Sequence, residues 1–332
     1  MKGVPDTVLV APDSFKGTHS AGGVARAIAS GLGEEGWAVD ECPVADGGEG
    51  TREILRGPLG GQPQTVRVHD PLGREVEAQF DLVAERGGHL AAVVESAAAA
   101  GLALVSSSER DPVAASTYGV GELILAAVGT GAKIVFLGVG GSATTDGGTG
   151  AIRALERGGG ISGVRLVVLC DVRTAFEDAA HIFAPQKGAT SEQVRRLTAR
   201  LHTMARRLPR DPRGLPLTGA AGGLSGGLWA AFGAELVPGA SFALDLIGFD
   251  ARLRAARAVV TGEGRIDRQS LAGKALGEVS FRARQAGVPS YAIVGQSQLE
   301  AFDQRILDLQ LVLEAGSIRQ ISSAARRLAR LI

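Results

Sequence analysis

Loops of one recurring design constrain the fold of this chain more than any other feature of its sequence. ADGGEG, GGSATTDGG and TGEGRID each follow a short apolar run and combine glycines with an Asp or a Glu. Glycine lets backbone N–H groups approach phosphate oxygens, and a carboxylate can hold Mg²⁺ or accept a hydroxyl proton. The pattern therefore indicates strands that end at a phosphate or metal site, although an ordinary turn explains any single loop equally well.

Strand and helix patterns alternate at both ends of the chain. Apolar, β-branched runs predict strands at 7–10, 37–43, 258–261, 290–294 and 311–313. Helices are predicted from Ser20, as the N-cap, to Leu32, and over 273–285 and 319–331. Such alternation is typical of parallel strands covered by helices, and so of a Rossmann-like α/β domain.

The pattern changes in the middle of the chain. From about Gln64, TVRVHD, REVEAQFDLV and LAAVVESA predict strands joined by short turns. Further on we predict strands at 133–139 and 164–169, and helices at 120–128, 193–208 and 228–236, with Thr51 capping a short helix. We therefore divide the chain into a discontinuous domain, 1–60 plus 252–332, and an inserted second α/β domain, 61–251. Residues 115–172 also alternate, and their assignment stays open.

Charge and composition exclude several classes of partner. At 332 residues the chain is long enough for two domains, and its 35 basic residues balance 35 acidic ones, so no global field attracts nucleic acid or an anionic membrane. No apolar run is long enough for an export signal or a membrane span, and we expect a cytoplasmic protein. Cys42 and Cys170 have no partner at metal-ligand spacing and are predicted to be buried free thiols.

The glycine loops match neither common nucleotide motif, since no G-x-x-x-x-G-K-[ST] and no well-placed G-x-G-x-x-G is present. Taken together, however, VLVAPDSFKG, PVADGGEGT, GVGGSATTDGG, FAPQKGA, GAAGGLSGG and VVTGEGRID resemble, in the same order, the bacterial glycerate kinases of glucarate and glyoxylate metabolism. The resemblance covers nearly the whole chain. It implies a flavodoxin-like domain with a second domain inserted.

The resemblance also implies an activity, namely ATP-dependent phosphorylation of D-glycerate with Mg²⁺ and with 2-phosphoglycerate as the favoured product. A kinase for another small hydroxy acid, such as tartronate or a larger aldonate, and a non-catalytic homologue that binds a nucleotide or an organic acid are the alternatives. We expect the chain to bind a small-molecule substrate and to bind neither nucleic acid nor a membrane. A homodimer is compatible with this expectation.

Phosphoryl transfer needs cations beside carboxylates, and this requirement selects the candidate residues. As catalytic residues we select Asp46, Asp171, Lys16 and Arg265, with Asp46 or Asp171 as the base. Asp146 and Asp267 are the candidates for Mg²⁺. Substrate or phosphate binding is predicted for Asp13, Ser14, Gly47, Gly48, Glu49, Gly140, Gly141, Ser142, Thr144, Lys187, Gly262, Glu263 and Lys274. For each cation a solvated surface charge is the alternative, and for Ser142 and Thr144 it is helix capping.

The sequence departs from the family pattern at several places. The segment from Leu155 to Val164 is abbreviated, and Arg173 to Phe176 replaces an Asn-Pro-Leu pattern. An alanine, Ala184, replaces a glycine in FAPQKGA, and the tail beyond Val294 also diverges.

Overall fold

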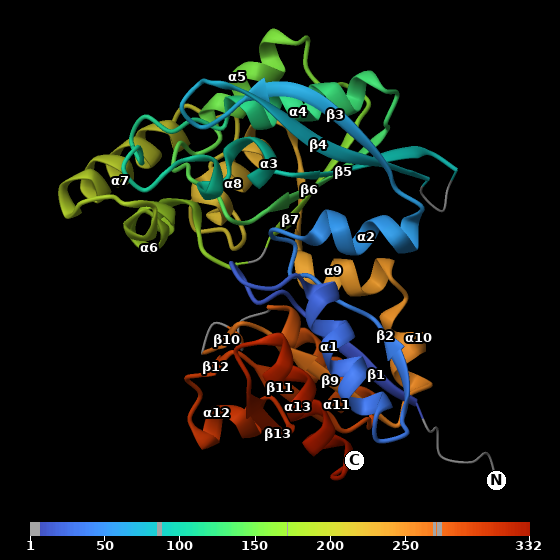
Figure 1. The fold of residues 1–332 in the computed structure, drawn as a ribbon. Helices are drawn as coiled ribbons and strands as arrows, with labels where there is room; N and C mark the ends of the chain where they lie inside the picture. The colour runs from blue at the N-terminus through green and yellow to red at the C-terminus, as the bar shows by residue number, and fades with distance from the viewer. Residues whose placement is uncertain (1–6, 85–87, 171, 268–269, 271–273) are drawn as a thin grey trace. The chain divides into compact units, whose positions relative to one another are not determined.

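The computed structural model describes residues 7–84, 88–170, 172–267, 270 and 274–332. The chain forms two compact units: unit 1 comprises Met1–Asp46 and Ala240–Ile332, and unit 2 comprises Gly47–Gly239 (Figure 1). The boundaries between the compact units therefore lie at 46/47 and 239/240, whereas the boundaries predicted from the sequence lie at 60/61 and 251/252. The extent of the domains stays a prediction.

Unit 1 contains a five-stranded sheet in the order β13-β11-β9-β1-β2, in which all neighbouring strands are parallel. Its strands are β1 (Thr7–Pro12), β2 (Ala38–Glu41), β9 (Ala258–Gly262), β11 (Ser290–Val294) and β13 (Leu309–Glu314). Numbered within this sheet alone, the strand order is 2-1-3-4-5, the doubly wound order of the flavodoxin-like fold. The predicted fold class, α/β with a Rossmann or flavodoxin-like parallel sheet and a second α/β part inserted, is confirmed.

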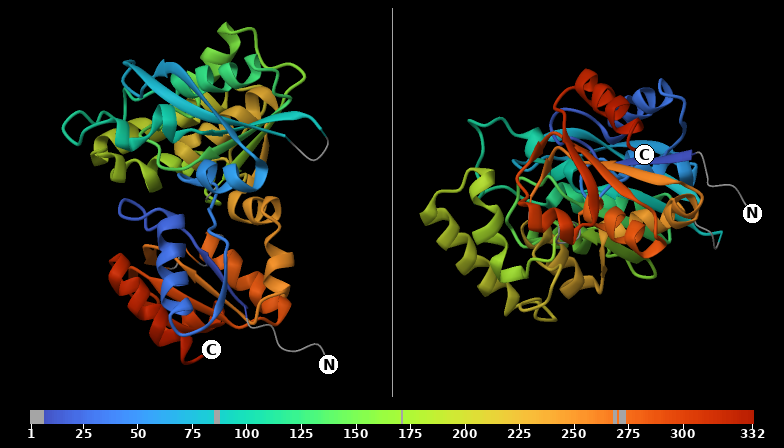
Figure 2. Two further views of the ribbon diagram at one scale, coloured as in Figure 1. Left: turned by 45° about the vertical axis from the view of Figure 1, so that its right-hand side comes forward. Right: turned by 90° about the horizontal axis from the view of Figure 1, so that it is seen from below.

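Helices cover both faces of this sheet because successive side chains of a strand point to opposite faces. Val8 and Val10 pack with α1 (Ala21–Gly33) and α13 (Ile318–Ala329), which lie side by side as the blue and red helices of Figure 2. Leu9 and Ala11 pack with the helices of the other face. The helices of that other face are α9 (Gly239–Leu246), α10 (Phe249–Arg254) and α11 (Ala275–Ala286). The remaining elements of unit 1 are α12 (Ala301–Ile306), β10 (Arg265–Ile266) and β12 (Gln296–Ser297). Each fully buried aliphatic side chain contributes about 1.5–3 kcal/mol to folding.

Unit 2 contains a six-stranded mixed sheet in the order β3-β4-β5-β6-β7-β8. Its strands are β3 (Gln62–His69), β4 (Glu75–Ala84), β5 (Leu90–Glu95), β6 (Ile134–Val139), β7 (Arg165–Cys170) and β8 (Glu235–Pro238). The pairs from β3 to β5 are antiparallel and those from β5 to β8 are parallel. The strands predicted from about Gln64 onward are confirmed, and residues 115–172 belong to this unit.

Helices α4, α5 and α8 contribute Leu123, Leu155 and Leu224 to the core that lies against the sheet of unit 2. The helical elements of the unit are α2 (Thr51–Leu59), α3 (Ala97–Ala100), η1 (Leu102–Leu104), α4 (Tyr118–Gly129), α5 (Thr149–Arg157), η2 (Phe176–Asp178), α6 (Ala179–Phe183), η3 (Pro185–Lys187), α7 (Ser191–Ala205) and α8 (Ala220–Phe232). The abbreviated segment after Leu155 is the end of α5 and a short turn before β7.

Two local predictions about helices were wrong and one is confirmed. Thr51 does not cap α2: Gly50 is the N-cap, and Thr51 is the first helical residue, whose hydroxyl donates to the Gly48 carbonyl at 2.7 Å. The predicted helix at 228–236 ends at Phe232, because Gly233 adopts a φ of 71° and β8 follows. Ser20 does cap α1, since its side chain accepts a bond from the Gly23 amide.

Both cysteines are buried free thiols, as predicted. Within the described ranges, no helix combines the length and the apolarity that crossing a bilayer requires.

Candidate active site

Carboxylates gather where the strands of unit 1 end. Asp13 directly follows β1, Glu263 directly follows β9, and Asp46 lies in the segment after β2. These residues are only 5%, 7% and 2% exposed, respectively. Strands β1 and β9 are the pair at which the strand order reverses, and ligands of doubly wound sheets bind at the carboxyl ends of strands at this point. The sheet topology therefore explains why these predicted residues lie together.

The environment of this carboxylate cluster, defined as Asp13, Asp46 and Glu263, favours the protonated form of two members. Burial and then the negative charge of Asp46 raise the pKa of Asp13 to about 8, although Lys16 opposes the shift. Burial likewise raises the pKa of Glu263 to about 7, with smaller contributions from Asp267 and Asp46. Strongly shifted carboxyl groups at a sheet switch point are typical of functional sites.

Lys16 is positioned by a tight turn beyond β1. Its Nζ lies 2.9 Å from Oδ2 of Asp46, and its side chain is 55% exposed. The turn is held by the buried ring of Phe15, whose amide donates to the His19 carbonyl at 2.9 Å, and Gly17 allows the reversal with a φ of 80°. Two residues that were selected separately as catalytic candidates thus form an ion pair, with the cation at the surface and the carboxylate buried.

Ser270 holds the Glu263 side of the cluster, and the sequence reading did not select it. Its hydroxyl donates to Oε1 of Glu263 and accepts a bond from the Asp267 amide at 3.2 Å. Lys274 is the N-cap residue of α11, and its Nζ lies 3.9 Å from Oε2 of Glu263. The serine three residues after an aspartate is a local turn signal that could have identified it. Arg265, in β10, is exposed.

The glycine loops of unit 2 contact one another. The Val139 amide donates to the Gly47 carbonyl at 3.0 Å, and a Cβ built on Gly140 would lie 2.5 Å from Cα of Gly48. A Cβ on Gly141 would lie 3.1 Å from Oε2 of Glu49. Only glycine fits the approach at Gly140, so Gly47, Gly48 and Glu49 form one surface with the loop after β6. Ser14 and Gly262 lie in unit 1, beside Asp13 and Glu263 in the sequence.

Glu95, at the end of β5, is a further carboxylate at the strand ends of unit 2 that the sequence reading did not select. One of its oxygens accepts a bond from the Arg52 amide at 2.7 Å. Burial is the largest cause that raises the pKa of Glu95, and the neighbouring charge of Glu49 adds to the shift. Asp171, which follows β7, lies outside the described residues.

Lys187 reaches the loop after β6 from the short η3 helix. Its side chain is buried, and its Nζ donates to Oγ of Ser142 at 3.0 Å and to the carbonyl of Thr144. Three residues of the predicted phosphate-binding set therefore lie together. The expectation that Ser142 and Thr144 stand at a helix start was wrong, because α5 begins only at Thr149.

Asp146 organises the same loop. Its Oδ2 accepts bonds from the amide and hydroxyl of Thr117, both at 2.9 Å, and from the Gly150 amide at 3.1 Å. Its Oδ1 accepts the Gly148 amide at 3.0 Å. A buried carboxylate with this many donors fixes a loop and an incoming helix. Thr117 is in none of the recognised motifs, and the sequence reading missed it.

Helix α8 closes on this loop through its glycines. Ala221, Gly222 and Gly223 have positive φ angles, and the Gly147 amide donates to the Gly222 carbonyl at 3.0 Å. A Cβ on Gly222 would lie 2.1 Å from the Thr144 carbonyl oxygen. The GAAGGLSGG string is thus a packing surface for the loop that carries Ser142 and Asp146.

Comparison with known proteins decides the family. The profile of the "Glycerate kinase family" matches residues 8–159 and 156–318. The chain belongs to the glycerate kinase family. A family member, the glycerate kinase of Halalkalibacterium halodurans, is 37% identical over 87% of this chain and 85% of its own length. The glycerate 2-kinase of Escherichia coli K12 is 36% identical over 87% and 84% of the two chains.

The fold of the chain is also similar to that of a solved structure. A crystal structure from Salmonella typhimurium LT2, provisionally described as glycerate kinase 2, matches with a TM-score of 0.79 and 33% identity. The match covers 98% of this chain and 97% of the other. The resemblance predicted from the six sequence strings is therefore confirmed. The roles of the individual site residues stay predictions.

Proposed function

We propose that the chain transfers the terminal phosphoryl group of ATP to the 2-hydroxyl of D-glycerate, giving 2-phosphoglycerate and ADP. The family, and relatives named glycerate kinase and glycerate 2-kinase, support the substrate. The observation that carries the proposal is the carboxylate cluster at the switch point of unit 1, with Lys16 bonded to Asp46. A base, a cation and buried groups of shifted pKa are what an alcohol phosphotransferase needs.

Asp46 is the residue that we assign to the hydroxyl. It accepts the hydroxyl proton as the substrate oxygen bonds to the γ-phosphorus and the bond from that phosphorus to the departing ADP oxygen breaks. Lys16 orients the carboxylate and partly balances its charge. Asp13, whose pKa is about 8, carries a proton at neutral pH and so adds no negative charge next to an anionic substrate. Asp171 is the other predicted base.

In unit 2 we assign phosphate binding to Lys187, Ser142 and the backbone of Gly140 and Gly141. The ammonium group of Lys187 already holds one hydroxyl and one carbonyl oxygen of this loop, and it can turn to phosphate oxygens in the same way. Gly141 is exposed, and a glycine there leaves its backbone N–H group accessible to an anion.

Mg²⁺, when bound, shields the charge of the transferred phosphoryl group. Of the two predicted ligands, Asp146 fits poorly because both of its oxygens already accept bonds. Asp267 fits better, since it is half-buried beside Glu263. Among the described residues, no group of three or more His, Cys, Asp or Glu side chains could hold a metal ion. Mg²⁺ is commonly held by one or two carboxylates plus substrate phosphates, so such a group is not required.

The test is ADP release by the wild type and by two matched variants of unit 1. Asp46→Asn should lower kcat by about 10²–10⁴-fold because the general base is lost. Asp40→Asn is the control, since Asp40 pairs with Arg252 instead. Equal activity of Asp46→Asn and the control would remove Asp46 from the mechanism. ADP release with tartronate or an aldonate but not with glycerate would change the substrate, and binding of ATP without any release would indicate a non-catalytic homologue.

The product position is read from the phosphorus spectrum. Phosphate on the 2-carbon couples to one proton and gives a doublet, whereas phosphate on the 3-carbon couples to two protons and gives a triplet. A triplet would contradict the 2-hydroxyl assignment and leave the kinase assignment intact.

A further inference from the structure

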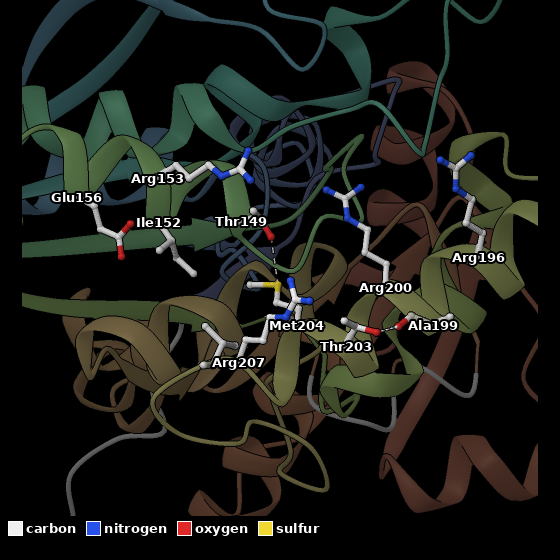
Figure 3. A pocket seen from close by; sticks show the side chains of 11 residues that line it. Thr149, Ile152, Arg153, Glu156, Arg196, Ala199, Arg200, Thr203, Met204 and Arg207 are labelled. Atoms are coloured by element: carbon white, nitrogen blue, oxygen red, sulfur yellow. Dashed lines mark hydrogen bonds between the residues drawn. The ribbon is translucent and has the colours of Figure 1, made fainter.

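A groove in unit 2 lies between α5 and α7, and it contains none of the residues selected for the reaction (Figure 3). Its volume is about 610 Å³, within the usual range of small-molecule sites. The residues that line the groove come from α5, from α7, and from Arg207 and Leu208, which follow α7 in the chain. They are Thr149, Ile152, Arg153, Glu156, Arg196, Ala199, Arg200, Thr203, Met204, Arg207 and Leu208.

The charge of this groove is strongly one-sided. Four guanidinium groups, those of Arg153, Arg196, Arg200 and Arg207, line it together with a single carboxylate, Glu156. The whole chain has no net charge, so the positive charge is a local feature. Figure 3 shows Arg153 on α5 and the other three on and beyond α7 around the same space.

The pairing of these arginines differs from that of many others in the chain. Arg74, Arg213 and Arg282, for example, each lie within hydrogen-bond distance of a carboxylate. Within the described residues, the guanidinium groups of Arg153, Arg196 and Arg207 make no hydrogen bond and no ion pair, and that of Arg200 donates to the Val113 carbonyl at 2.9 Å. Like charges that line one groove without partners repel one another, and a bound anion relieves that repulsion.

The floor of the groove is formed by less polar groups. Ile152, Met204 and Leu208 line it, and the Thr149 hydroxyl donates to the Met204 sulfur at 3.1 Å, which joins the two helices (Figure 3). The Thr203 hydroxyl is engaged with the Ala199 carbonyl at 2.9 Å. The arginines are therefore the groups that would select a ligand.

We propose that this groove is a binding site for a small anion that carries several phosphate groups. Guanidinium groups bind phosphate oxygens through paired, charge-assisted hydrogen bonds, and several of them on one concave surface match a chain of phosphates better than a single carboxylate. The site is additional to the one proposed for the kinase reaction, because Asp46, Lys16 and Lys187 do not line it. Sodium tripolyphosphate and AMP are the probes that separate a phosphate chain from a nucleoside.

The experiment is calorimetric titration of the full chain with sodium tripolyphosphate. Arg196→Gln/Arg207→Gln removes two lining arginines, and Arg195→Gln/Arg206→Gln removes the same charge from neighbouring positions that do not line the groove. The first double variant should bind tripolyphosphate at least about tenfold more weakly than the wild type, and the control should stay within about twofold. All four side chains are exposed, so folding should survive, which thermal unfolding of both variants checks.

Equal weakening in both double variants would overturn the proposal, because it would show a general effect of charge. Failure of the wild type to bind tripolyphosphate would overturn it too. Binding of AMP but not of tripolyphosphate, lost in the lining variant, would replace the polyphosphate with a nucleoside monophosphate. The readout is binding and not turnover, so its failure leaves the proposed kinase activity untouched.

Discussion

The buried ammonium group of Lys187 donates to Oγ of Ser142 at 3.0 Å, which joins two sequence strings that lie 45 residues apart. The same nitrogen donates to the carbonyl of Thr144. An ammonium group in a buried position is costly to desolvate, so this lysine must be held by well-placed oxygens. The loop after β6 and the η3 helix therefore depend on each other.

Lys187→Met should destabilise the chain and reduce activity together. Removal of the donor leaves buried acceptors on Ser142 and Thr144 unsatisfied, which costs about 1–3 kcal/mol of unfolding free energy. Urea unfolding measures this loss, and the ADP-release assay should show a drop of at least about 100-fold in kcat/KM if the lysine binds phosphate. Lys133→Met, at an exposed turn, is the control. Normal stability of Lys187→Met would argue against this pairing.

Lys16→Met should separate activity from stability. Half of the Lys16 side chain is in solvent, so its ion pair with Asp46 contributes less than about 1 kcal/mol to folding. We nevertheless expect kcat to fall by at least about tenfold, because the charge beside the proposed base is lost. Lys16→Arg should recover part of that activity. The role fails if Lys16→Met unfolds normally and also turns over normally.

The stability of unit 1 should depend on the proton of Asp13. The pKa of Asp13 is about 8 in the folded chain, compared with 3.8 for an unperturbed group. Between these values the folded state binds more protons than the unfolded state, so this group's contribution is complete below about pH 4 and is lost as the pH rises toward 8.

Asp13→Asn removes this titration and isolates it from the carboxylates that act in the opposite sense. Relative to the wild type, the variant should become more stable as the pH rises from 5 to 8, by at most about 1.4 kcal/mol per pH unit. Urea unfolding with EDTA present measures the difference at each pH. The same difference at both pH values would show that Asp13 is ionised in the folded chain.

Asp146→Ala tests whether that carboxylate holds the loop or a metal ion. Loss of its bonds to Thr117, Gly148 and Gly150 should cost about 2–4 kcal/mol of unfolding free energy, measured without metal. Asp111→Ala is the matched control, because Asp111 accepts amide bonds in an exposed turn. Unchanged stability together with weaker Mg²⁺ dependence of turnover would instead make Asp146 a metal ligand.

Local patterns predicted most strands and helices because their periodicity reflects the faces that they bury. The strand at 7–10 and the helix capped by Ser20 show this in β1 and α1. The apolar run LWAAFGAELV was harder, because apolarity alone does not distinguish a helix from a strand, and the left-handed Gly233 is what separates them. The predicted domain boundaries at 60 and 251 were placed where the pattern of strands and helices changes. The compact units instead meet after Asp46 and before Ala240.

The candidate site was predictable to the extent that its residues belong to strings at strand ends. Parallel strands bring such ends to one edge, and this explains why Asp13, Asp46 and Glu263 are close together in unit 1. Thr117 and Ser270 were not predicted, because each acts through a carboxylate partner that the local sequence does not reveal. Thr117 bonds to Asp146, which lies 29 residues away, and Ser270 bonds to Glu263. The arginines of the groove escaped because helical surface charges usually contact only water.

The position of β1 between β2 and β9 has a consequence for synthesis on the ribosome. Strand β1 needs a neighbour that is encoded some 250 residues later, as the bond from Thr261 to the Ala11 carbonyl illustrates. Unit 2 can complete its own sheet as it emerges, whereas β1 must keep an apolar edge unpaired until β9 has been translated. Translation order thus delays the native surroundings of the segment that carries Asp13 and Lys16 until β9 and Glu263 have been made.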